Sequence, residues 1–290
     1  FTLGLNMWNS WQFWVVVYLV STVMFSQVFH ASNRKMKDAG ALTILLEGCT
    51  AFFACLFIPF FPMKWPTSFE VYITLGIVMI LYAITDRLNI EARYGLAPST
   101  FSMLKQLSTV FLMIFGFLFL KEPFVLKKVI GACLIVLSNI FLAFDNNGKI
   151  HLNKYFIMSF ISNFLFAIAM LINVNISDNF NLGIYTVLTV SIPALIIFIF
   201  GKYSVKKLQK ELSYYDKKRF LLTGFSWAMM LLSSVRAYQL ESVTIVAPLL
   251  PLTAILNVIY EFIVKKNKQE FFTKILLGIL IFIGVLLIKS

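Results

Sequence analysis

Charge is scarce in this sequence. Asp, Glu, Lys and Arg make up 13% of its 290 residues, whereas an ordinary soluble domain has about 25%. Cysteine and histidine are scarcer still, with three and two residues. The cysteines, Cys49, Cys55 and Cys133, lie within apolar runs without the spacing of metal ligands, and an odd number of thiols gives no disulfide framework. The composition therefore excludes an ordinary soluble domain and a disulfide-stabilised one.

Several catalytic and nucleotide-binding motifs are also missing. The sequence contains no G-x-x-x-x-G-K-[ST] loop, which would bind ATP, and no G-x-S-x-G elbow, which would hold a nucleophilic serine. The histidines, His30 and His151, lie near the ends of different apolar runs without the spacing of metal ligands. We therefore expect no metal, no cofactor and no enzyme activity. A membrane-embedded enzyme remains the alternative from another functional class.

Apolar residues, in contrast, are abundant: they make up 60% of the chain, and the mean hydropathy is +0.86. A hydrocarbon core of about 30 Å needs about 20 apolar residues for each crossing helix. Apolar runs separated by charges and turn residues predict ten such helices. The predicted fold class is an all-α polytopic membrane protein. The predicted helices cover residues 10–31, 41–61, 69–92, 97–120, 125–144, 153–176, 182–201, 219–242, 246–264 and 271–289.

Two short segments repeat at an offset of 150 residues: "EARYGLAP" at 91–98 and "ESVTIVAP" at 241–248 each close one predicted helix and open the next. The chain therefore divides into two five-helix repeats, residues 10–144 and 153–289. Because five is odd, the second repeat enters the membrane in the opposite orientation, which predicts an inverted repeat with a shared interface near mid-membrane. The basic segment 202–219 is expected to form a loop or an interfacial amphipathic helix.

The basic residues are distributed unevenly over the predicted loops. Loops that follow odd-numbered helices hold 17 of them, and loops on the other side hold five. Cytoplasmic loops carry the excess of Lys and Arg, so this count places both chain termini outside. We interpret the net charge of +12 as a topology signal and not as a nucleic-acid-binding surface.

The repeated segment and the residues after it resemble the drug/metabolite transporter superfamily, in particular its EamA-type branch of ten-helix carriers. Ala92–Pro98 stands where those proteins have "AL.y..A", and "FLFLKEPF" (117–124) is similar to the "LLLGERL" that closes their fourth helix, with Glu122 on the Glu. Gly131 matches the glycine that opens their fifth helix. Two features depart from the pattern: "KKNKQEFF" in the second repeat, and Glu47, near a position that is often basic. The resemblance implies a carrier with both termini in the cytoplasm, against the count of basic residues, so the orientation stays open.

A further stretch resembles the nucleotide-sugar carriers. "FSMLKQLSTVF" (101–111) is similar to "YTIFKNLTIIL" of the GDP-mannose carriers, with Lys105 on the Lys. Other nucleotide-reading motifs of those carriers are absent, because the seventh predicted helix has "IYTVLTV" in place of "FYNN" and the ninth has "AILNV" in place of "GALNK". A nucleotide-sugar or phosphorylated-metabolite antiporter is therefore kept as the alternative carrier.

Two cations lie deep within predicted helices, one in each repeat: Lys105 in the fourth and Arg236 in the eighth. Because a charge at the bilayer centre costs at least about 2.5–3.5 kcal/mol, such residues face a partner or a water-filled cavity. We expect both cations to line one central cavity and bind a carboxylate or phosphate; an ion pair is the alternative for each. The residues expected at this substrate site are Lys105, Arg236, Tyr82, Asp86, Gln106, Gln239, Tyr18, Gln27 and Asn163.

Acidic residues within the helices are candidates for proton coupling. A carboxylate among apolar groups takes up a proton more readily than one in water, which suits a proton-coupled carrier, and we assign this role to Glu47 and Asp86. Arg87 and Glu91 have the i to i+4 spacing of a structural ion pair, and Arg93 is expected at the membrane interface. An aromatic cage around a cationic substrate, with Glu47 as counter-charge, is the alternative to an anion site.

These patterns predict secondary active transport of a small polar organic metabolite by alternating access, with proton coupling or exchange as the driving step. The expected partners are a small-molecule substrate and the lipid bilayer, without nucleic acid. We expect an integral protein of a prokaryotic inner (plasma) membrane, as a monomer or homodimer.

Overall fold

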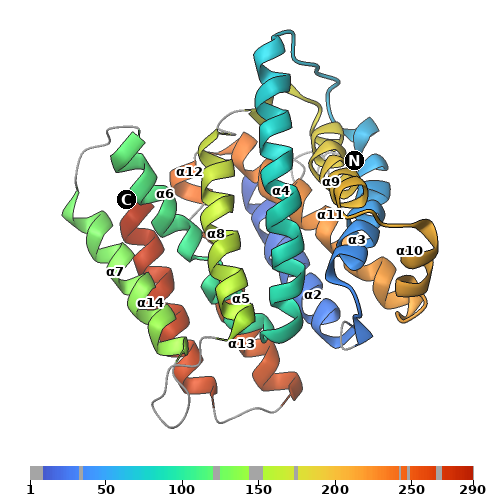
Figure 1. Ribbon diagram of the computed structural model, residues 1–290. Coiled ribbons are helices and arrows are strands. Elements are labelled where there is room, and N and C mark those ends of the chain that lie inside the picture. Colours follow the sequence, from blue (N-terminus) through green and yellow to red (C-terminus); the bar gives the residue numbers. More distant parts are fainter. Residues whose placement is uncertain are drawn as a thin grey trace.

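The computed structural model describes residues 9–32, 35–119, 125–143, 153–172, 176–241, 243–246, 249–265 and 270–289. Every regular element within these ranges is a helix (Figure 1), so the predicted all-α class is confirmed. The long helices are α2 (Trp11–Ser32), α3 (Ala39–Cys55), α4 (Phe69–Gly95), α6 (Leu107–Phe119), α7 (Leu126–Ala143), α8 (Lys154–Ile172), α9 (Leu182–Phe200), α11 (Lys217–Leu240), α13 (Leu252–Lys265) and α14 (Phe271–Lys289). The short helices are η2 (Ile58–Phe60), α5 (Pro98–Leu104), η3 (Ile176–Asn179), α10 (Val205–Leu212) and α12 (Val243–Val246).

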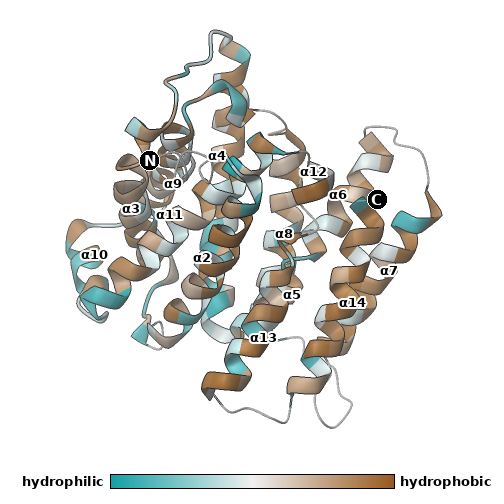
Figure 2. Cartoon of the chain, turned by 180° about the vertical axis from the view of Figure 1, so that it is seen from behind, coloured by the Kyte–Doolittle hydropathy of each residue, from teal (hydrophilic) through white to brown (hydrophobic). Residues whose placement is uncertain are grey.

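Within the described residues, seven helical segments are long and apolar enough to cross a membrane: α2, α4, α5 with α6, α8, α9, α11 and α14. α3 and α13 are shorter apolar helices. The distribution of polarity is the reverse of that in a soluble protein, because large apolar residues such as Ile199 and Leu276 are exposed whereas Glu47, Asn163 and Asn257 are buried. Figure 2 shows hydrophobic residues along the outer faces of the long helices and hydrophilic ones on α10. The protein is therefore an integral membrane protein.

Two predicted helices begin or end elsewhere in the structure. The helix predicted at 41–61 ends at Cys55, because Pro59 lies in the separate turn η2. The helix predicted at 246–264 becomes α13, which begins at Leu252, directly after a proline. Proline lacks an N–H group and has a fixed φ, so it is favoured in the first turn of a helix.

The helices pack in pairs that join distant parts of the sequence. The main pairs are α2 with α11, α4 with α8, α3 with α9, α7 with α14, and α5 with α13. The backbones of α7 and α14 approach closely: a Cβ atom at Gly131 would overlap the carbonyl oxygen of Gly284, and one at Gly284 would lie 2.6 Å from the carbonyl oxygen of Gly131. Only glycine permits this approach, as in other small-residue contacts between membrane helices.

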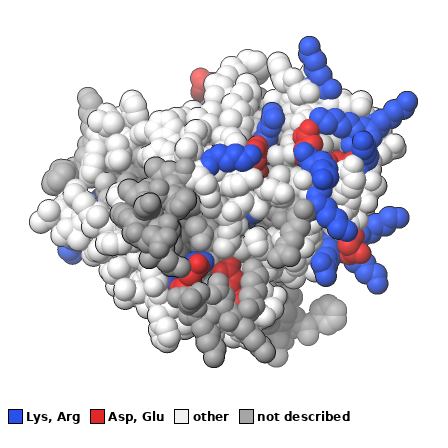
Figure 3. All heavy atoms as spheres, turned by 60° about the horizontal axis from the view of Figure 1, so that its bottom comes forward, with Lys and Arg blue, Asp and Glu red and all other residues white. Residues whose placement is uncertain are grey.

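Exposed basic residues gather at one side of the face shown in Figure 3, over α10 and the neighbouring helix ends. Segment 202–219 contains α10, whose eight residues include three lysines. α2 begins, and α14 ends, toward the opposite face (Figure 1). The basic residues of this face are Lys35, Lys37, Lys202, Lys206, Lys207, Lys210, Lys217, Lys218 and Arg219.

Candidate functional site

The fourth predicted helix is interrupted. A turn at Lys105 and Gln106 separates α5 from α6, so the prediction of one continuous helix over 97–120 is wrong at these positions. The backbone bonding changes there, because the N–H of Gln106 donates to the carbonyl of Met103, three residues back, at 3.1 Å. Non-helical backbone within a membrane is tolerated where protein groups or a water-filled cavity satisfy it.

Two predicted site residues bond the backbone at this interruption. Asn163 Nδ2, on α8, donates to the carbonyl oxygen of Leu104 at 2.8 Å, and Gln106 Nε2 donates to that of Ser102 at 3.3 Å. An interruption leaves carbonyl groups without helical partners, and these amides supply the missing donors. Asn163 is therefore a support for the interruption.

The ammonium group of Lys105 lies over the ring of Phe166 on α8, with 3.8 Å between Nζ and the ring centroid. Tyr82 on α4 stacks on the same ring, with centroids 6.3 Å apart. Asp86 and Arg93 act electrostatically on Lys105. Among the described residues, however, no carboxylate forms a direct ion pair with it. Lys105 thus ends on an aromatic platform between two helices.

Glu47 and Asp86, the two candidates for proton coupling, are adjacent. Glu47 on α3 has an exposed fraction of 0%, and the group that faces its carboxyl is the carboxyl of Asp86 on α4, within hydrogen-bonding reach. No donor in the described part of the chain reaches either carboxyl oxygen of Glu47. Two carboxyl groups this close attract one another only when a proton lies between them.

Arg93 points into the helix bundle. Its guanidinium lies between the rings of Phe25 and Phe101, 4.7 and 3.9 Å from their centroids, and Nη1 donates to Ser26 Oγ at 3.1 Å. Cation–π contacts with two rings hold the charge inside. This differs from the expected position of Arg93 among the lipid headgroups.

The predicted ion pair between Arg87 and Glu91 is not formed, although the structure describes both residues. Glu91 lies 3.5 Å from the Nζ atom of Lys154 on α8, and Arg87 is exposed. A base that precedes an acid by four residues is the weaker order of such a pair, and the neighbouring helix supplies another cation.

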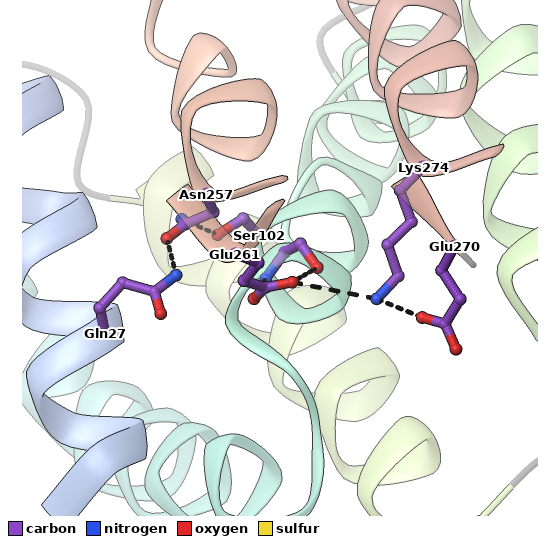
Figure 4. Close-up of polar contacts among 7 residues, drawn as sticks. Gln27, Ser102, Asn257, Glu261, Glu270 and Lys274 are labelled. Atoms are coloured by element: carbon purple, nitrogen blue, oxygen red, sulfur yellow. Dashed lines mark hydrogen bonds and ion pairs between the residues drawn. The ribbon is translucent and has the colours of Figure 1, made fainter. Parts of the chain in front are cut away.

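A chain of amide and hydroxyl groups joins three helices (Figure 4). Gln27 Nε2 on α2 donates to Asn257 Oδ1 on α13 at 2.8 Å, and Asn257 Nδ2 donates to Ser102 Oγ on α5 at 2.9 Å. All three side chains are buried. Gln27, predicted in the substrate site, is thus part of an interhelical contact. Sequence reasoning missed Asn257, although a carboxamide within an apolar run is a signal for such a role.

Glu261 holds the beginning of α5 in place. Its carboxylate accepts hydrogen bonds from the backbone N–H of Ser99 at 3.0 Å and from Ser99 Oγ at 2.6 Å, and it lies 4.0 Å from Lys274 Nζ. Lys274 also pairs with Glu270 at 2.8 Å (Figure 4). The first N–H groups of a helix have no helical acceptor, and Glu261 supplies one from α13. This contact was also missed, because the sequence favours a role for Glu261 near Lys265, whose side chain lies outside the described residues.

Arg236 and Gln239 line a cavity of about 320 Å³ at the end of α11. No residue named above around Lys105 lines it, among those the structure describes. Lys105 and Arg236, which we expected in one central cavity, therefore have separate surroundings. The other described residues of the wall are Phe61, Pro62, Lys64, Asp178, Phe180, Leu182 and Tyr238.

Two tyrosines link the cavity at Arg236 with Arg93 through electrostatic interactions. Tyr238 lines the outer cavity, and Tyr18 on α2 interacts electrostatically with both Tyr238 and Arg93. Tyr18, a predicted site residue, thus interacts with residues of both regions.

A separate polar cluster holds the basic face together outside the spans. Asp38, at the beginning of α3, accepts hydrogen bonds from Tyr203 at 2.7 Å and from the Ala41 N–H at 3.0 Å, and it pairs with Lys207. Partial burial alone would raise the pKa of Asp38, but these three contacts outweigh it and lower the pKa. Burial, followed by the bond to Asp38, raises the pKa of Tyr203 to about 12.

Other predicted or alternative sites have less support. An aromatic cage would draw on rings such as Trp14, Trp227 and Tyr260, but Trp14 and Trp227 pack in separate apolar clusters and Tyr260 is exposed. Within the described ranges, no group of three or more His, Cys, Asp or Glu residues could hold a metal ion. Glu122, which carries part of the family resemblance, lies outside the described residues.

No protein-family model matches the sequence, and no curated protein matches it. Among solved structures, 22 chains match the fold. One of them, described only as "Crystal structure of protein", matches with a TM-score of 0.50 and 10% sequence identity, over 95% of this chain and 97% of that chain. The likeness shows a shared fold over nearly the full length of both chains.

Proposed function

We propose that the protein is a secondary active transporter that moves a small polar organic metabolite across a membrane by alternating access. The observation that carries this proposal is the pair of carboxyl groups, Glu47 and Asp86, next to Lys105 at an interrupted helix. A buried acid without a donor is costly in a membrane interior, and ionisable groups kept there mark ion or substrate pathways. Interrupted helices provide such sites in transporters.

The pairing of helices supports an inverted repeat of five and five. Under the proposal, α2, α3, α4, α5 with α6, and α7 correspond in order to α8, α9, α11, α12 with α13, and α14. Exchanging the two sets turns the α2–α11 contact into the α8–α4 contact and leaves the α3–α9, α5–α13 and α7–α14 contacts unchanged. A pseudo-two-fold axis in the membrane plane produces this symmetry of contacts.

The proposed coupling uses the charge that faces Lys105. With one proton between them, Glu47 and Asp86 carry a single negative charge and hold α3 and α4 together. Loss of that proton leaves two like charges whose repulsion separates the helices. Gain of a second proton removes the negative charge, so Lys105 is free to bind an anionic group of the substrate on its aromatic platform. Proton uptake by the carboxyl pair thereby favours substrate binding, and substrate binding favours proton uptake in return.

The test uses purified protein in proteoliposomes, with a substrate selected by thermal-shift screening against amino acids, nucleobases, phosphorylated sugars, nucleotide sugars and quaternary amines. Glu47→Gln is expected to abolish uphill uptake driven by a pH gradient and to retain exchange of labelled for unlabelled substrate. Glu211→Gln, at a buried acid near the basic face, is the matched control and is expected to keep both activities.

Equal gradient-driven uptake by Glu47→Gln and wild type would refute the coupling role, and unchanged uptake in a folded Lys105→Ala variant would refute the site.

A further inference from the structure

The cavity at Arg236 has the size and walls of a small-molecule site. Its volume is about 320 Å³, at the lower end of the roughly 300–1,000 Å³ found for ligand pockets. Taking about 30 Å³ for each water molecule, it has room for about ten water-sized groups. The cavity lies at the C-terminal end of α11, beside the segment that follows α3. It is on the side opposite the basic face.

Arg236 carries donors that the protein leaves unused. Its Nε atom is buried without a partner in the described part of the chain, and Nη1 makes one long contact of 3.5 Å with Gln239 Oε1. The ring of Phe61, with its centroid 5.7 Å from Cζ, lies beside the guanidinium. A guanidinium that lines a cavity can bind the two oxygens of a carboxylate through its terminal N–H groups.

Two further charged residues in the wall of the cavity determine which net charge a ligand can carry there. Lys64 adds a second positive charge and Asp178 adds one negative charge, and no ion pair joins these two described residues. The three groups together carry one net positive charge, which a monoanion neutralises. A second negative charge on the ligand would meet the repulsion of Asp178. Asp178 also offers an acceptor to a hydroxyl or ammonium group of the ligand.

The wall of this cavity is held in place before any ligand arrives. Asn181 Nδ2 donates to the carbonyl oxygens of Ile58 at 3.1 Å, Phe61 at 2.8 Å and Pro62 at 3.2 Å. The Asn181 N–H donates to the carbonyl of Lys64 at 3.0 Å. One buried residue therefore fixes the whole segment that carries Phe61 and Lys64, which reduces the entropic cost of binding.

We propose that this cavity is a second binding site, separate from the Glu47, Asp86 and Lys105 cluster, for a small organic monocarboxylate bearing a hydroxyl or ammonium group. Its carboxylate binds the guanidinium of Arg236, its polar group bonds Asp178, and its apolar part packs on Phe61. Binding here does not require the proposed transport function.

The test is calorimetric titration of the full chain in lipid nanodiscs with lactate, phenyllactate and serine as monocarboxylate probes, and with succinate, inorganic phosphate and choline for comparison. We expect saturable binding of at least one monocarboxylate and weaker or no binding of the other three compounds. Arg236→Gln should weaken that binding by roughly tenfold or more, since a hydrogen bond to a charged group is lost. Lys127→Gln, at an exposed position of α7 outside both sites, should leave it unchanged.

A second variant keeps the proposal falsifiable if Arg236→Gln does not fold. Asp178→Asn removes the repelling charge and is expected to strengthen binding of succinate relative to the monocarboxylates, whereas a structural role for Asp178 would weaken all ligands together. The proposal is overturned if no monocarboxylate probe binds, if a folded Arg236→Gln variant binds like wild type, or if Lys127→Gln abolishes binding. Failure of the transport test with intact lactate or serine binding would reject the transporter alone.

Discussion

The buried acids near the basic face and those in the interior of the helix bundle differ in their hydrogen-bond partners. Near the basic face, Glu211 accepts hydrogen bonds from the Lys37 N–H at 3.0 Å and the Tyr215 hydroxyl at 3.2 Å. At the loop end of α13, Glu261 accepts two bonds from Ser99. In the interior, Glu47 has no described donor and faces another acid.

The acids that have hydrogen-bond donors and the acid without a described donor are buried for different reasons. Buried polar groups in folded proteins are nearly always bonded, and each exception needs an explanation. Glu211 and Glu261 join neighbouring segments and satisfy backbone N–H groups, so their burial contributes to folding. Glu47 makes no such bond among the described residues, and the proposed proton-dependent role would account for its burial.

The largest expected effect tests this difference by removing one acid from each region. Glu261→Leu leaves the Ser99 N–H and Lys274 without their acceptor, and we expect it to lower the free energy of unfolding by roughly 1–3 kcal/mol for each unsatisfied group. Glu47→Leu removes a buried polar group that has no described donor, and we expect little change or a gain in stability. Thermal unfolding in detergent, followed by tryptophan fluorescence, measures both variants.

Glu261→Gln is the matched control, since its carboxamide oxygen still accepts from Ser99. We expect its melting temperature to lie between those of wild type and Glu261→Leu. An equal loss of stability in Glu47→Leu and Glu261→Leu would show that the two regions do not differ, and the functional assignment of Glu47 would lose its basis.

A smaller effect is expected in the amide chain between the two regions. A double-mutant cycle with Gln27→Leu and Asn257→Leu measures the coupling between these side chains. Interhelical hydrogen bonds in membranes contribute about 0.6 kcal/mol on average and up to about 1.7 kcal/mol, and we expect a coupling within this range because both groups are buried. Additive losses in the two single variants would show that the 2.8 Å contact does not contribute to stability.

Hydropathy predicted the long apolar helices, of which seven segments in the described residues are long and apolar enough to cross a membrane, against ten predicted. The interruption at Lys105 and Gln106 was not predictable, since the surrounding "MLKQLS" contains neither proline nor glycine. The structure supports it with Asn163 from α8, which donates to a carbonyl next to the turn. Such a tertiary contact between residues 59 positions apart leaves no local pattern in the sequence.

For the candidate site, too, positions in the sequence did not determine which residues lie together. Depth within the helix predicted Glu47 and Asp86 as separate candidates for proton coupling, and their proximity to one another appears only in the structure. Whether Lys105 and Arg236 line one cavity depends on helix packing, and in the structure they have separate surroundings. Arg87 and Glu91 had the spacing of a pair, but the cation of α8 competes for the acid.

The smallest expected effect lies at the basic end, where Asp38 is bonded by Tyr203, Lys207 and the Ala41 N–H. The pKa of Asp38 is lowered in the folded protein, so its contribution to stability is complete above the pKa of about 3.9 of an unfolded Asp. That contribution is lost as the pH falls through the lower folded pKa. Asp38→Asn removes this dependence, and because the side chain is partly exposed we expect a loss of less than about 1 kcal/mol at neutral pH.

Melting temperatures of wild type and Asp38→Asn, measured from pH 7 to pH 3, test this expectation. The two curves should be separated at pH 7 and should converge below about pH 4, where the wild-type carboxyl gains its proton. Tyr203→Phe removes one of the three bonds but keeps the carboxylate, so its curve should retain the acid-dependent loss with a smaller amplitude. A constant separation between wild type and Asp38→Asn over the whole range would mean that the Asp38 carboxylate has no special affinity for its partners, and the basic end would then be held by packing alone.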